Sequence, residues 1–275
     1  MKFALVDGTK TEAAKVFKGI CPSCGSELIA KCGERKINHW AHKGTRTCDP
    51  WWEPETEWHR SWKNNYPIEW QEVFLPDEKT GEKHIADVRT AHNLVIEFQH
   101  SHIDPKERAT RERFYQNMVW VVDGTRLKRD YSRFLKGRND FRNTEKQGVF
   151  LVDFPEESFP SPWLESSVPV IFDFRGLETI DNINDVRNRL YCLLPIRKGR
   201  YTILAQISYK AFINTSINGD WSLRVRNFIE NLIPPKQEQQ NQIAEQQIPQ
   251  ANNIIRRRES QWILERGKWK RRKRF

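Results

Sequence analysis

The fold of this chain is decided by a stretch that runs Glu55-Thr56-Glu57-Trp58-His59, Lys63, Ile85-Ala86-Asp87-Val88 and Ile96-Glu97-Phe98-Gln99. Pro54 favours the start of a helix because its fixed backbone angle suits the first helical position, and Pro67 marks the end of that helix. Glu55, His59 and Lys63 recur every four residues, which predicts that they share one helix face. The simpler alternative is a surface stripe stabilised by contacts between neighbouring turns.

Three strands are predicted after this helix. Residues 68–75 are rich in β-forming side chains, and residues 84–89 and 94–99 are expected to pair across a short turn. Because side chains alternate along a strand, Glu97 and Gln99 point to one face, and their apolar neighbours face a helix layer.

A second helix and a fourth strand complete the pattern. Asp104 and Pro105 provide an N-cap and a proline at the first helical position, and this helix is expected to end near Asn117. The apolar run 119–123 is typical of a buried strand. The order helix, three strands, helix, strand predicts an α/β (α+β) fold with a mixed sheet flanked by helices.

Carboxylates from three of these elements are predicted to meet. Glu55, Asp87 and Glu97 offer the hard oxygen ligands that Mg²⁺ and Mn²⁺ prefer. A metal held in this way binds a phosphodiester and activates water, so the pattern is typical of a divalent-metal nuclease. The alternative is a hairpin with two exposed acids. We favour the metal site because the flanking residues are apolar, and unpaired acids in a buried sheet are unfavourable.

The first 50 residues are predicted to form a Cys/His-rich module. They contain four of the five cysteines, and in a protein without secretory features such clustering favours metal over disulfides. Cys21 and Cys24 resemble a zinc knuckle, and a second pair of ligands some fifteen residues later suits tetrahedral Zn²⁺. His39, His42 and Cys48 compete for that second pair. A metal-free loop of reduced cysteines is the alternative.

The net charge of +10 is concentrated near the C-terminal end. Residues 251–275 carry ten Lys or Arg and two Glu, whereas the other 250 residues carry a net charge of only +2. Such a tail neutralises nucleic-acid phosphates, and Trp262 and Trp269 are candidates for stacking on single-stranded bases. A solvated, disordered tail is the alternative. The candidate nucleic-acid-binding residues are Arg256, Arg257, Arg258, Lys268, Lys270, Arg271, Arg272, Lys273 and Arg274.

The rest of the chain carries no recognisable chemical motif. Residues 126–235 contain four strand-like runs and a helical run at 221–232, and residues 236–253 are Gln-rich, as in a linker. The predicted division is a zinc-binding, ribbon-like module at 1–50, a core at 51–125, a region of unknown role at 126–235, and a linker with a basic tail at 236–275. No apolar run approaches the ~20 residues of a membrane span, and the first residues are too polar for a signal peptide, which favours a cytoplasmic location without membrane insertion.

Taken in order, five short motifs resemble the competence protein CoiA-like family. They are Cys-x-x-Cys, His-Trp-Ala-His, Glu-Thr-x-x-His-x-x-x-Lys, Ala-Asp-Val and Ile-Glu-Phe-Gln-x-Ser, followed by a Val-Trp-Val-Val-Asp strand. The likeness covers roughly residues 15–125. This family is similar to the PD-(D/E)xK nuclease superfamily, whose core has the order of elements predicted above. Its members are associated with natural transformation and the processing of incoming DNA.

The resemblance implies catalytic roles for six positions. Asp87 and Glu97 match the metal ligands, and Gln99 stands where the superfamily usually has Lys. An amide does not titrate and cannot act as a base, although it can orient a water molecule by hydrogen bonding, so the group that orients the attacking water stays open. The matching positions are Glu55, His59, Lys63, Asp87, Glu97 and Gln99.

Together these patterns predict a metal-dependent deoxyribonuclease that acts on incoming or foreign DNA, single-stranded or processed. Mg²⁺ or Mn²⁺ would serve catalysis and Zn²⁺ the structure, with competence or defence proteins as partners beside DNA. Two alternatives remain open. One is a zinc-containing nucleic-acid-binding protein without catalysis, and the other is an adaptor in a DNA-processing or defence complex that uses residues 126–235.

Overall fold

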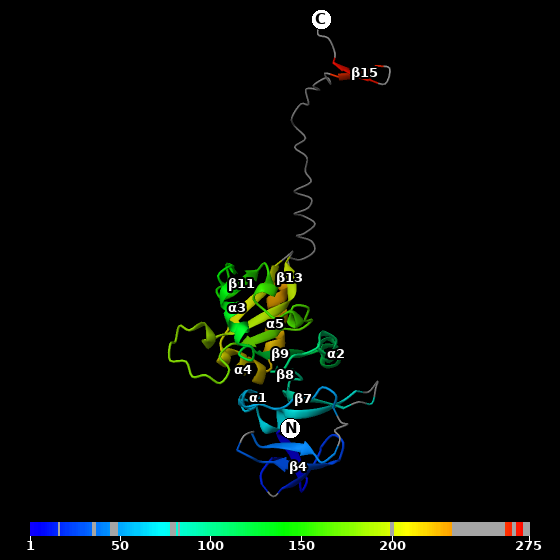
Figure 1. Ribbon diagram of the computed structural model, residues 1–275, viewed down its shortest axis with the longest axis vertical. Helices are drawn as coiled ribbons and strands as arrows, with labels where there is room; N and C mark the ends of the chain where they lie inside the picture. Colours follow the sequence, from blue (N-terminus) through cyan, green and yellow to red (C-terminus); the bar gives the residue numbers. More distant parts are fainter. Residues whose placement is uncertain are drawn as a thin grey trace. The chain divides into compact units, whose positions relative to one another are not determined.

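The chain divides into two units, Met1–Ile229 and Glu230–Phe275, and the described residues of the larger one form two sheets and five α-helices (Figure 1). The computed structural model describes residues 1–15, 17–34, 37–44, 49–77, 81, 83–198, 201–232, 262–265 and 268–271. Within these ranges, no helix is long and apolar enough to cross a membrane. The larger unit is a mixed α+β structure, as predicted.

The first sheet lies at the N-terminal end of the larger unit (Figure 1, blue). It is wholly antiparallel, in the order β2-β1-β3-β4-β5. Leu28 and Trp40 belong to its apolar core and are at most 2% exposed. A Cβ at Gly19 would lie 2.6 Å from the Cβ of Ala4, so only glycine fits there. The strands are β1 (Phe3–Val6), β2 (Thr9–Glu12), β3 (Lys18–Ile20), β4 (Glu27–Lys31) and β5 (His39–His42).

The second sheet has nine strands in the order β10-β11-β14-β13-β12-β9-β8-β7-β6. Strands β8, β9 and β12 run parallel to one another, and all other neighbours are antiparallel. The strands are β6 (Gln71–Pro76), β7 (Lys83–Arg89), β8 (Val95–Gln99), β9 (Met118–Asp123), β10 (Arg142–Asn143), β11 (Val149–Val152), β12 (Val170–Asp173), β13 (Leu190–Lys198) and β14 (Tyr201–Ile207). The helices are α1 (Glu57–Lys63), α2 (Pro105–Tyr115), α3 (Lys128–Arg138), α4 (Tyr209–Ile217) and α5 (Trp221–Glu230), with single 3₁₀ turns at Ile68–Trp70, Pro155–Glu157, Ser161–Trp163 and Val186–Asn188.

The predicted order of helix, three strands, helix and strand is confirmed as α1, β6, β7, β8, α2 and β9. Helix α2 has Asp104 as its N-cap and Pro105 at its first position, and β9 is buried along its whole length. Phe98 faces the helix layer, since its ring stacks on that of Trp62 with the centroids 5.7 Å apart. These agreements come from strong local signals: a cap, a fixed proline angle and an apolar run.

The start of the first helix differs from the prediction. Helix α1 begins at Glu57 and not at Pro54, so Glu55 precedes the helix instead of lying on it. The cause is a capping box at Thr56: its side chain accepts the N–H of His59, and the His59 ring accepts the N–H of Thr56. A threonine N-cap thus overrides the proline signal two residues earlier.

Two further boundaries differ. The strand predicted at 68–75 begins only at Gln71, because residues 68–70 form a 3₁₀ turn. Helix α2 ends at Tyr115, before Asn117, because Gln116 takes a φ of 59° that no right-handed helix accommodates.

The residues after position 125 continue the same sheet. Strand β12 lies parallel beside β9, and β13, β14, β11 and β10 extend the sheet from there. The predicted strand runs and helical run correspond to β11 to β14 and α5, whereas α3, α4 and β10 have no clear sequence signal. At the end of β12, the carboxylate of Asp173 accepts the indole N–H groups of Trp58 and Trp62, each at 3.0 Å. This region therefore helps to fix α1 on the sheet.

The first sheet attaches to the second through β6 and the start of β7. The carboxylate of Glu72 accepts the backbone N–H groups of Lys2 and Phe3 at 2.7 and 3.0 Å. The Lys2 ammonium donates to the side-chain oxygen of Gln71 at 2.9 Å, and Lys83 donates to the carbonyl of Ser23 at 3.0 Å. Glu72 and Lys2 are 6% and 1% exposed, so this is a buried polar junction.

The second unit contains a two-stranded antiparallel hairpin that the sequence patterns do not predict. It pairs β15 (Trp262–Glu265) with β16 (Lys268–Arg271), and Leu264 lies opposite Trp269 in the register. Of the candidate basic residues, Lys268, Lys270 and Arg271 lie in β16. Those at 256–258 and 272–274, like the predicted linker at 236–253, lie outside the described residues.

Candidate functional site

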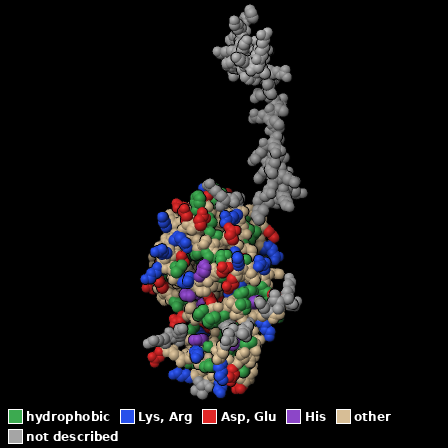
Figure 2. Space-filling model, turned by 45° about the vertical axis from the view of Figure 1, so that its right-hand side comes forward, with side chains coloured by type: hydrophobic (Ala, Val, Ile, Leu, Met, Phe, Trp, Pro, Cys, Tyr) green, Lys and Arg blue, Asp and Glu red, His purple; other side chains and the backbone are tan. Residues whose placement is uncertain are grey.

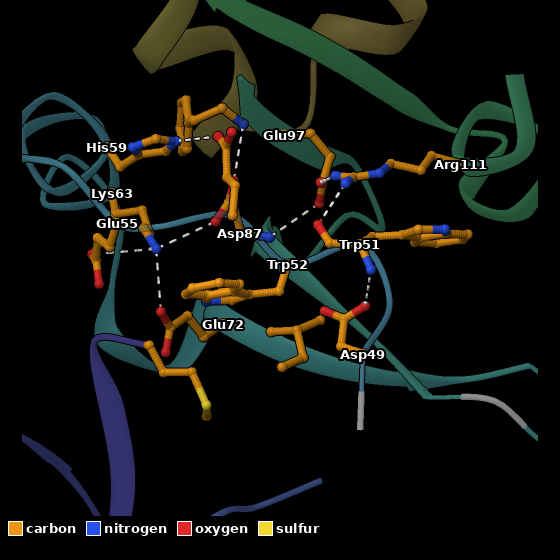
Figure 3. A pocket seen from close by; sticks show the side chains of 14 residues that line it. Asp49, Trp51, Trp52, Glu55, His59, Lys63, Glu72, Asp87, Glu97 and Arg111 are labelled. Atoms are coloured by element: carbon orange, nitrogen blue, oxygen red, sulfur yellow. Dashed lines mark hydrogen bonds and ion pairs between the residues drawn. The ribbon is translucent and has the colours of Figure 1, made fainter. Parts of the chain in front are cut away.

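A cavity of about 50 Å³ lies between α1 and the strands β6, β7 and β8 (Figure 3). Of the six positions singled out by the sequence, five line it and one, Gln99, does not. The lining residues are Met1, Asp49, Trp51, Trp52, Glu53, Glu55, His59, Lys63, Glu72, Ile85, Asp87, Glu97, Phe98 and Arg111.

The ammonium group of Lys63 lies among three carboxylates (Figure 3). Its Nζ is 3.4 Å from Glu55, 3.2 Å from Glu72 and 3.3 Å from Asp87. Burial alone lowers the pKa of Lys63, but the three negative charges, that of Asp87 first, outweigh it, and the pKa lies well above its ordinary value. The site therefore contains a fixed cation.

Asp87 and Glu97 form a carboxyl pair on neighbouring strands. The N–H of Asp87 donates to Glu97 at 3.2 Å, the N–H of Phe98 donates to Asp87 at 3.0 Å, and Arg111 donates to the second oxygen of Glu97 at 3.0 Å. Burial, followed by the charge of Asp87, raises the pKa of Glu97 to about 8, and Arg111 opposes this only in part. The negative charge of this carboxyl pair is only partly compensated by Arg111, and a divalent cation would supply further positive charge.

Glu55 also lacks compensation by hydrogen bonds. Its side chain is 5% exposed, and within the described residues neither carboxylate oxygen has a hydrogen-bond partner. It forms ion pairs with Lys63 at 3.4 Å and with Arg60 at 3.6 Å. A buried carboxylate without hydrogen bonds, in the same pocket as a carboxyl pair, fits a divalent cation, although Lys63 lies between Glu55 and Asp87. Within the described residues, no set of three or more acidic side chains has ligand atoms that all lie within 4.8 Å of one another.

Glu53 is a site residue that the sequence patterns miss. Its carboxylate accepts the Nε2–H of His59 at 2.6 Å, the amide of Gln99 at 3.1 Å, the N–H of His100 at 3.1 Å, and both the N–H and the hydroxyl of Ser101. Burial raises the pKa of Glu53, but these hydrogen bonds, that of His59 first, lower it to about 2. No motif marks Glu53. The sequence offers no signal for it, because its partners at Gln99, His100 and Ser101 lie far away along the chain.

His59 and Gln99 are engaged in holding the site together. The Nδ1 of His59 accepts the N–H of Thr56 at 3.2 Å, and its Nε2 donates to Glu53, so both ring nitrogens are occupied. The Gln99 amide donates to Glu53 and to Ser101 and lies outside the cavity lining. Neither side chain has the free group that direct contact with a substrate phosphate requires.

A second set of potential metal ligands lies in the first sheet. Cys21, Cys24 and His42 offer ligand atoms that all lie within 4.8 Å of one another, with the Cys24 sulfur 3.4 Å from Nε2 of His42. Burial raises the pKa of Cys24, but hydrogen bonds with Ser26 and His42 lower it to about 6, which favours the thiolate. This group is compatible with a metal such as Zn²⁺.

Among the described residues of this module, His39 and Cys32 do not join the cluster. His39 is an odd number of residues from His42 on β5, so it faces the other side of the strand, and its Nδ1 lies 2.9 Å from the carbonyl of Ile37. Cys32 follows β4 and packs against the core of the first sheet. Cys48 lies outside the described residues.

The chain is therefore a mixed α+β protein that has a Cys/His cluster near its N-terminus and a buried pocket lined by carboxylates. The model of the N-terminal domain of competence protein CoiA matches residues 7–50. The competence protein CoiA of Bacillus subtilis (strain 168) is 29% identical over 148 residues, which cover 48% of this chain and 38% of that relative. No solved structure matches. The two matches support the resemblance read from the motifs: the chain is similar to competence protein CoiA, and it spans less than half the length of that relative.

Proposed function

We propose that this protein is a metal-dependent nuclease that hydrolyses phosphodiester bonds in DNA during the processing of incoming or foreign DNA. The observation that carries the proposal is the carboxyl pair of Asp87 and Glu97 beside the buried ammonium of Lys63. Acidic ligands next to a fixed cation are the groups that phosphoryl transfer requires. The family name of the relative, a competence protein, supports the same biological setting.

The order of elements supports a core of the PD-(D/E)xK type. Strand β7 carries Asp87 and the adjacent β8 carries Glu97, between helices α1 and α2. Gln99 follows two residues later, where that superfamily usually has Lys. Because its amide is bound to Glu53 and Ser101, we assign the cationic role to Lys63, which reaches the pocket from α1.

Asp87 and Glu97 would hold Mg²⁺ or Mn²⁺, with Glu55 as a further carboxylate. When bound, such a metal polarises a phosphate and lowers the pKa of its water ligand. Lys63 would then share Asp87 with the metal, and its ammonium would stabilise negative charge that develops on the phosphate. Glu53 and His59 would keep α1 and the end of β8 at a fixed distance.

Three further features support nucleic acid as the substrate. Trp52 lines the pocket and is 49% exposed, as a base-stacking residue requires. The basic residues at 256–274 give the tail its positive charge, whereas the face of the larger unit in Figure 2 mixes acidic and basic side chains. The Cys21, Cys24 and His42 cluster, with Cys48 as a fourth ligand, would hold a structural Zn²⁺.

A second candidate function is nucleic-acid binding without catalysis. One observation favours it: Lys63 already pairs with Glu55, Glu72 and Asp87, so the pocket is partly neutralised by the protein itself. In this case the carboxylates serve only the structure, and the basic tail and the Cys/His module bind the nucleic acid.

A cleavage assay separates the two functions. Linear and circular DNA, single- and double-stranded, is incubated with Mg²⁺, Mn²⁺ or EDTA. The proteins compared are wild type, Asp87→Asn, Glu97→Gln and the control Asp220→Asn. The side chain of Asp220 is 48% exposed and does not line the pocket. We expect metal-dependent cutting by wild type and the control, and a loss of at least a hundredfold in both pocket variants. Cutting that survives in both variants, or no cutting by wild type while DNA is bound, would overturn the nuclease.

A further inference from the structure

The carboxyl ends of the three parallel strands bring a second group of functional side chains together. His100 follows β8, Arg126 follows β9, and Arg175 follows β12. The loops after β9 and β12 touch, since the N–H of Gly124 donates to the carbonyl of Asp173 at 2.8 Å. Carboxyl ends of parallel strands are a common position for ligand sites. None of these three side chains lines the carboxylate pocket.

His100 is held in one orientation and keeps a free nitrogen. Its Nδ1 lies 2.7 Å from the carboxylate of Asp123, which is 3% exposed in its side chain and also accepts the N–H and hydroxyl of Thr125. The His100 side chain is 34% exposed, and within the described residues its Nε2 has no hydrogen-bond partner. The hydrogen bond to Asp123 raises the pKa of His100, which favours the imidazolium.

The two arginines keep their guanidinium groups available. Arg126 is exposed and near enough to His100 for its charge to oppose protonation of the imidazole. The guanidinium of Arg175 stacks on the ring of Tyr209 at 3.7 Å, and this contact fixes its plane. In the part of the chain that the structure describes, neither guanidinium has a hydrogen-bonded acid. The nearby acids are used elsewhere: Asp173, for example, accepts from Trp58 and Trp62.

Glu53 joins this cluster to the pocket. One oxygen of its carboxylate accepts both the Nε2–H of His59 at 2.6 Å and the backbone N–H of His100 at 3.1 Å. The rings of these two histidines are 5.9 Å apart between centroids. An anion bound at the cluster would therefore lie beside a phosphate bound in the pocket.

We propose that His100, Arg126 and Arg175 form a phosphate-binding subsite that holds a backbone phosphate of the nucleic acid next to the one cleaved. The proposal rests on the proposed function for the identity of its ligand. Guanidinium groups and an oriented imidazole are donors suited to a phosphate. The subsite adds affinity and register, and the reacting atoms stay in the carboxylate pocket.

The test is binding of a labelled oligonucleotide as a function of salt, in buffer without Mg²⁺ or Mn²⁺, so that no cleavage occurs while the Zn²⁺ proposed for the Cys/His cluster is kept. The double variant Arg126→Gln/Arg175→Gln and the single variant His100→Gln are compared with Arg197→Gln. The control residue, Arg197, lies near the end of β13. Because β13 is antiparallel to β12, this end lies on the side of the sheet away from the carboxyl ends of the parallel strands. We expect about tenfold weaker binding for the double variant, with the slope of log K against log salt reduced by about one, and a change below twofold for the control.

Asp123→Asn provides a second route to the same result, because it releases His100 without touching either arginine. It is expected to weaken binding as His100→Gln does. Equal affinity and equal salt slope in the double variant and the control would overturn the subsite. If wild type still cleaves DNA in that case, only the subsite fails. If the variants lose binding but wild type cleaves nothing, the subsite stands and the nuclease fails.

Discussion

The carboxylate pocket and the Cys/His cluster gather metal-binding groups in opposite ways. In the pocket the chain supplies its own counter-charges, with Lys63 among three carboxylates and Arg111 on Glu97. In the cluster the donor atoms of Cys21, Cys24 and His42 converge within 4.8 Å. We infer that the pocket folds without metal and needs it for activity, whereas the cluster needs metal for folding.

The largest expected effect is on the cluster. Cys24→Ser removes a thiolate ligand, and zinc content should fall from about one ion per chain to near zero, with the first sheet losing its fold, because structural zinc contributes about 10 kcal/mol or more to small modules. Cys32→Ser is the matched control, since Cys32 is outside the group. Metal analysis and circular dichroism of both variants are the measurements. Equal zinc content in the two would refute the assignment.

The next effect is on the pocket. Lys63→Met leaves three buried carboxylates without their shared cation, and we expect the free energy of unfolding to fall by about 3–5 kcal/mol. Mn²⁺ should restore part of that loss in the variant, because it replaces the missing positive charge. Urea unfolding with and without Mn²⁺ measures both, with the exposed Lys210→Met as control. A variant as stable as wild type would show that these acids need no compensation.

Acid should loosen the junction between the two sheets. Burial raises the pKa of Glu72, but Lys63, the terminal amine and the N–H groups of Lys2 and Phe3 outweigh this and lower it to about 2, below the ordinary value of 4.5. Because the folded pKa is the lower one, the stabilisation is complete above pH 4.5 and is lost as pH falls towards 2, at most roughly 3 kcal/mol. Unfolding of wild type and Glu72→Gln at pH 6 and pH 3 tests this. The difference in stability between them should be clearly smaller at pH 3 than at pH 6, and a constant difference would exclude Glu72 as the titrating group.

Glu53 and Glu55, which both line the pocket, should respond differently to the same change. Glu53→Gln places an amide where five donors need an acceptor, and we expect a loss of about 1–3 kcal/mol. Glu55→Gln should cost less than about 1 kcal/mol, because Glu55 accepts no hydrogen bond within the described residues and Lys63 keeps two other partners. Thermal unfolding of the Glu53→Gln and Glu55→Gln variants measures both losses. A larger loss for Glu55→Gln than for Glu53→Gln would contradict our account of both residues.

The contrast between these two acids shows what the sequence could predict. Glu55 belongs to a spaced pattern with His59 and Lys63, and that pattern located the pocket even though Glu55 precedes the helix. Glu53 belongs to no pattern, since apart from His59 its partners lie 46 to 48 residues away, at and just after the end of β8. Likewise, Asp173 holds α1 from 111 and 115 residues away, so the dependence of the site on the later strands had no local signal.

The smallest expected effect tests Gln99, which stands where the proposed PD-(D/E)xK core usually has Lys. Gln99→Lys restores the usual lysine, but the side chain at 99 is directed to Glu53 and Ser101 rather than into the cavity. The new ammonium would form an ion pair with Glu53 in place of the amide hydrogen bond, so stability should change by less than about 1 kcal/mol. Cleavage should change by no more than a few fold, because Lys63 already supplies the cation in the pocket. Rates of DNA cleavage at saturating Mn²⁺ measure this, with Gln206→Lys in β14 as the control. Gln71 would not serve as a control because it is part of the junction between the sheets. A rise of a hundredfold or more would mean that position 99 does reach the substrate, and that the cationic role we assign to Lys63 belongs to it.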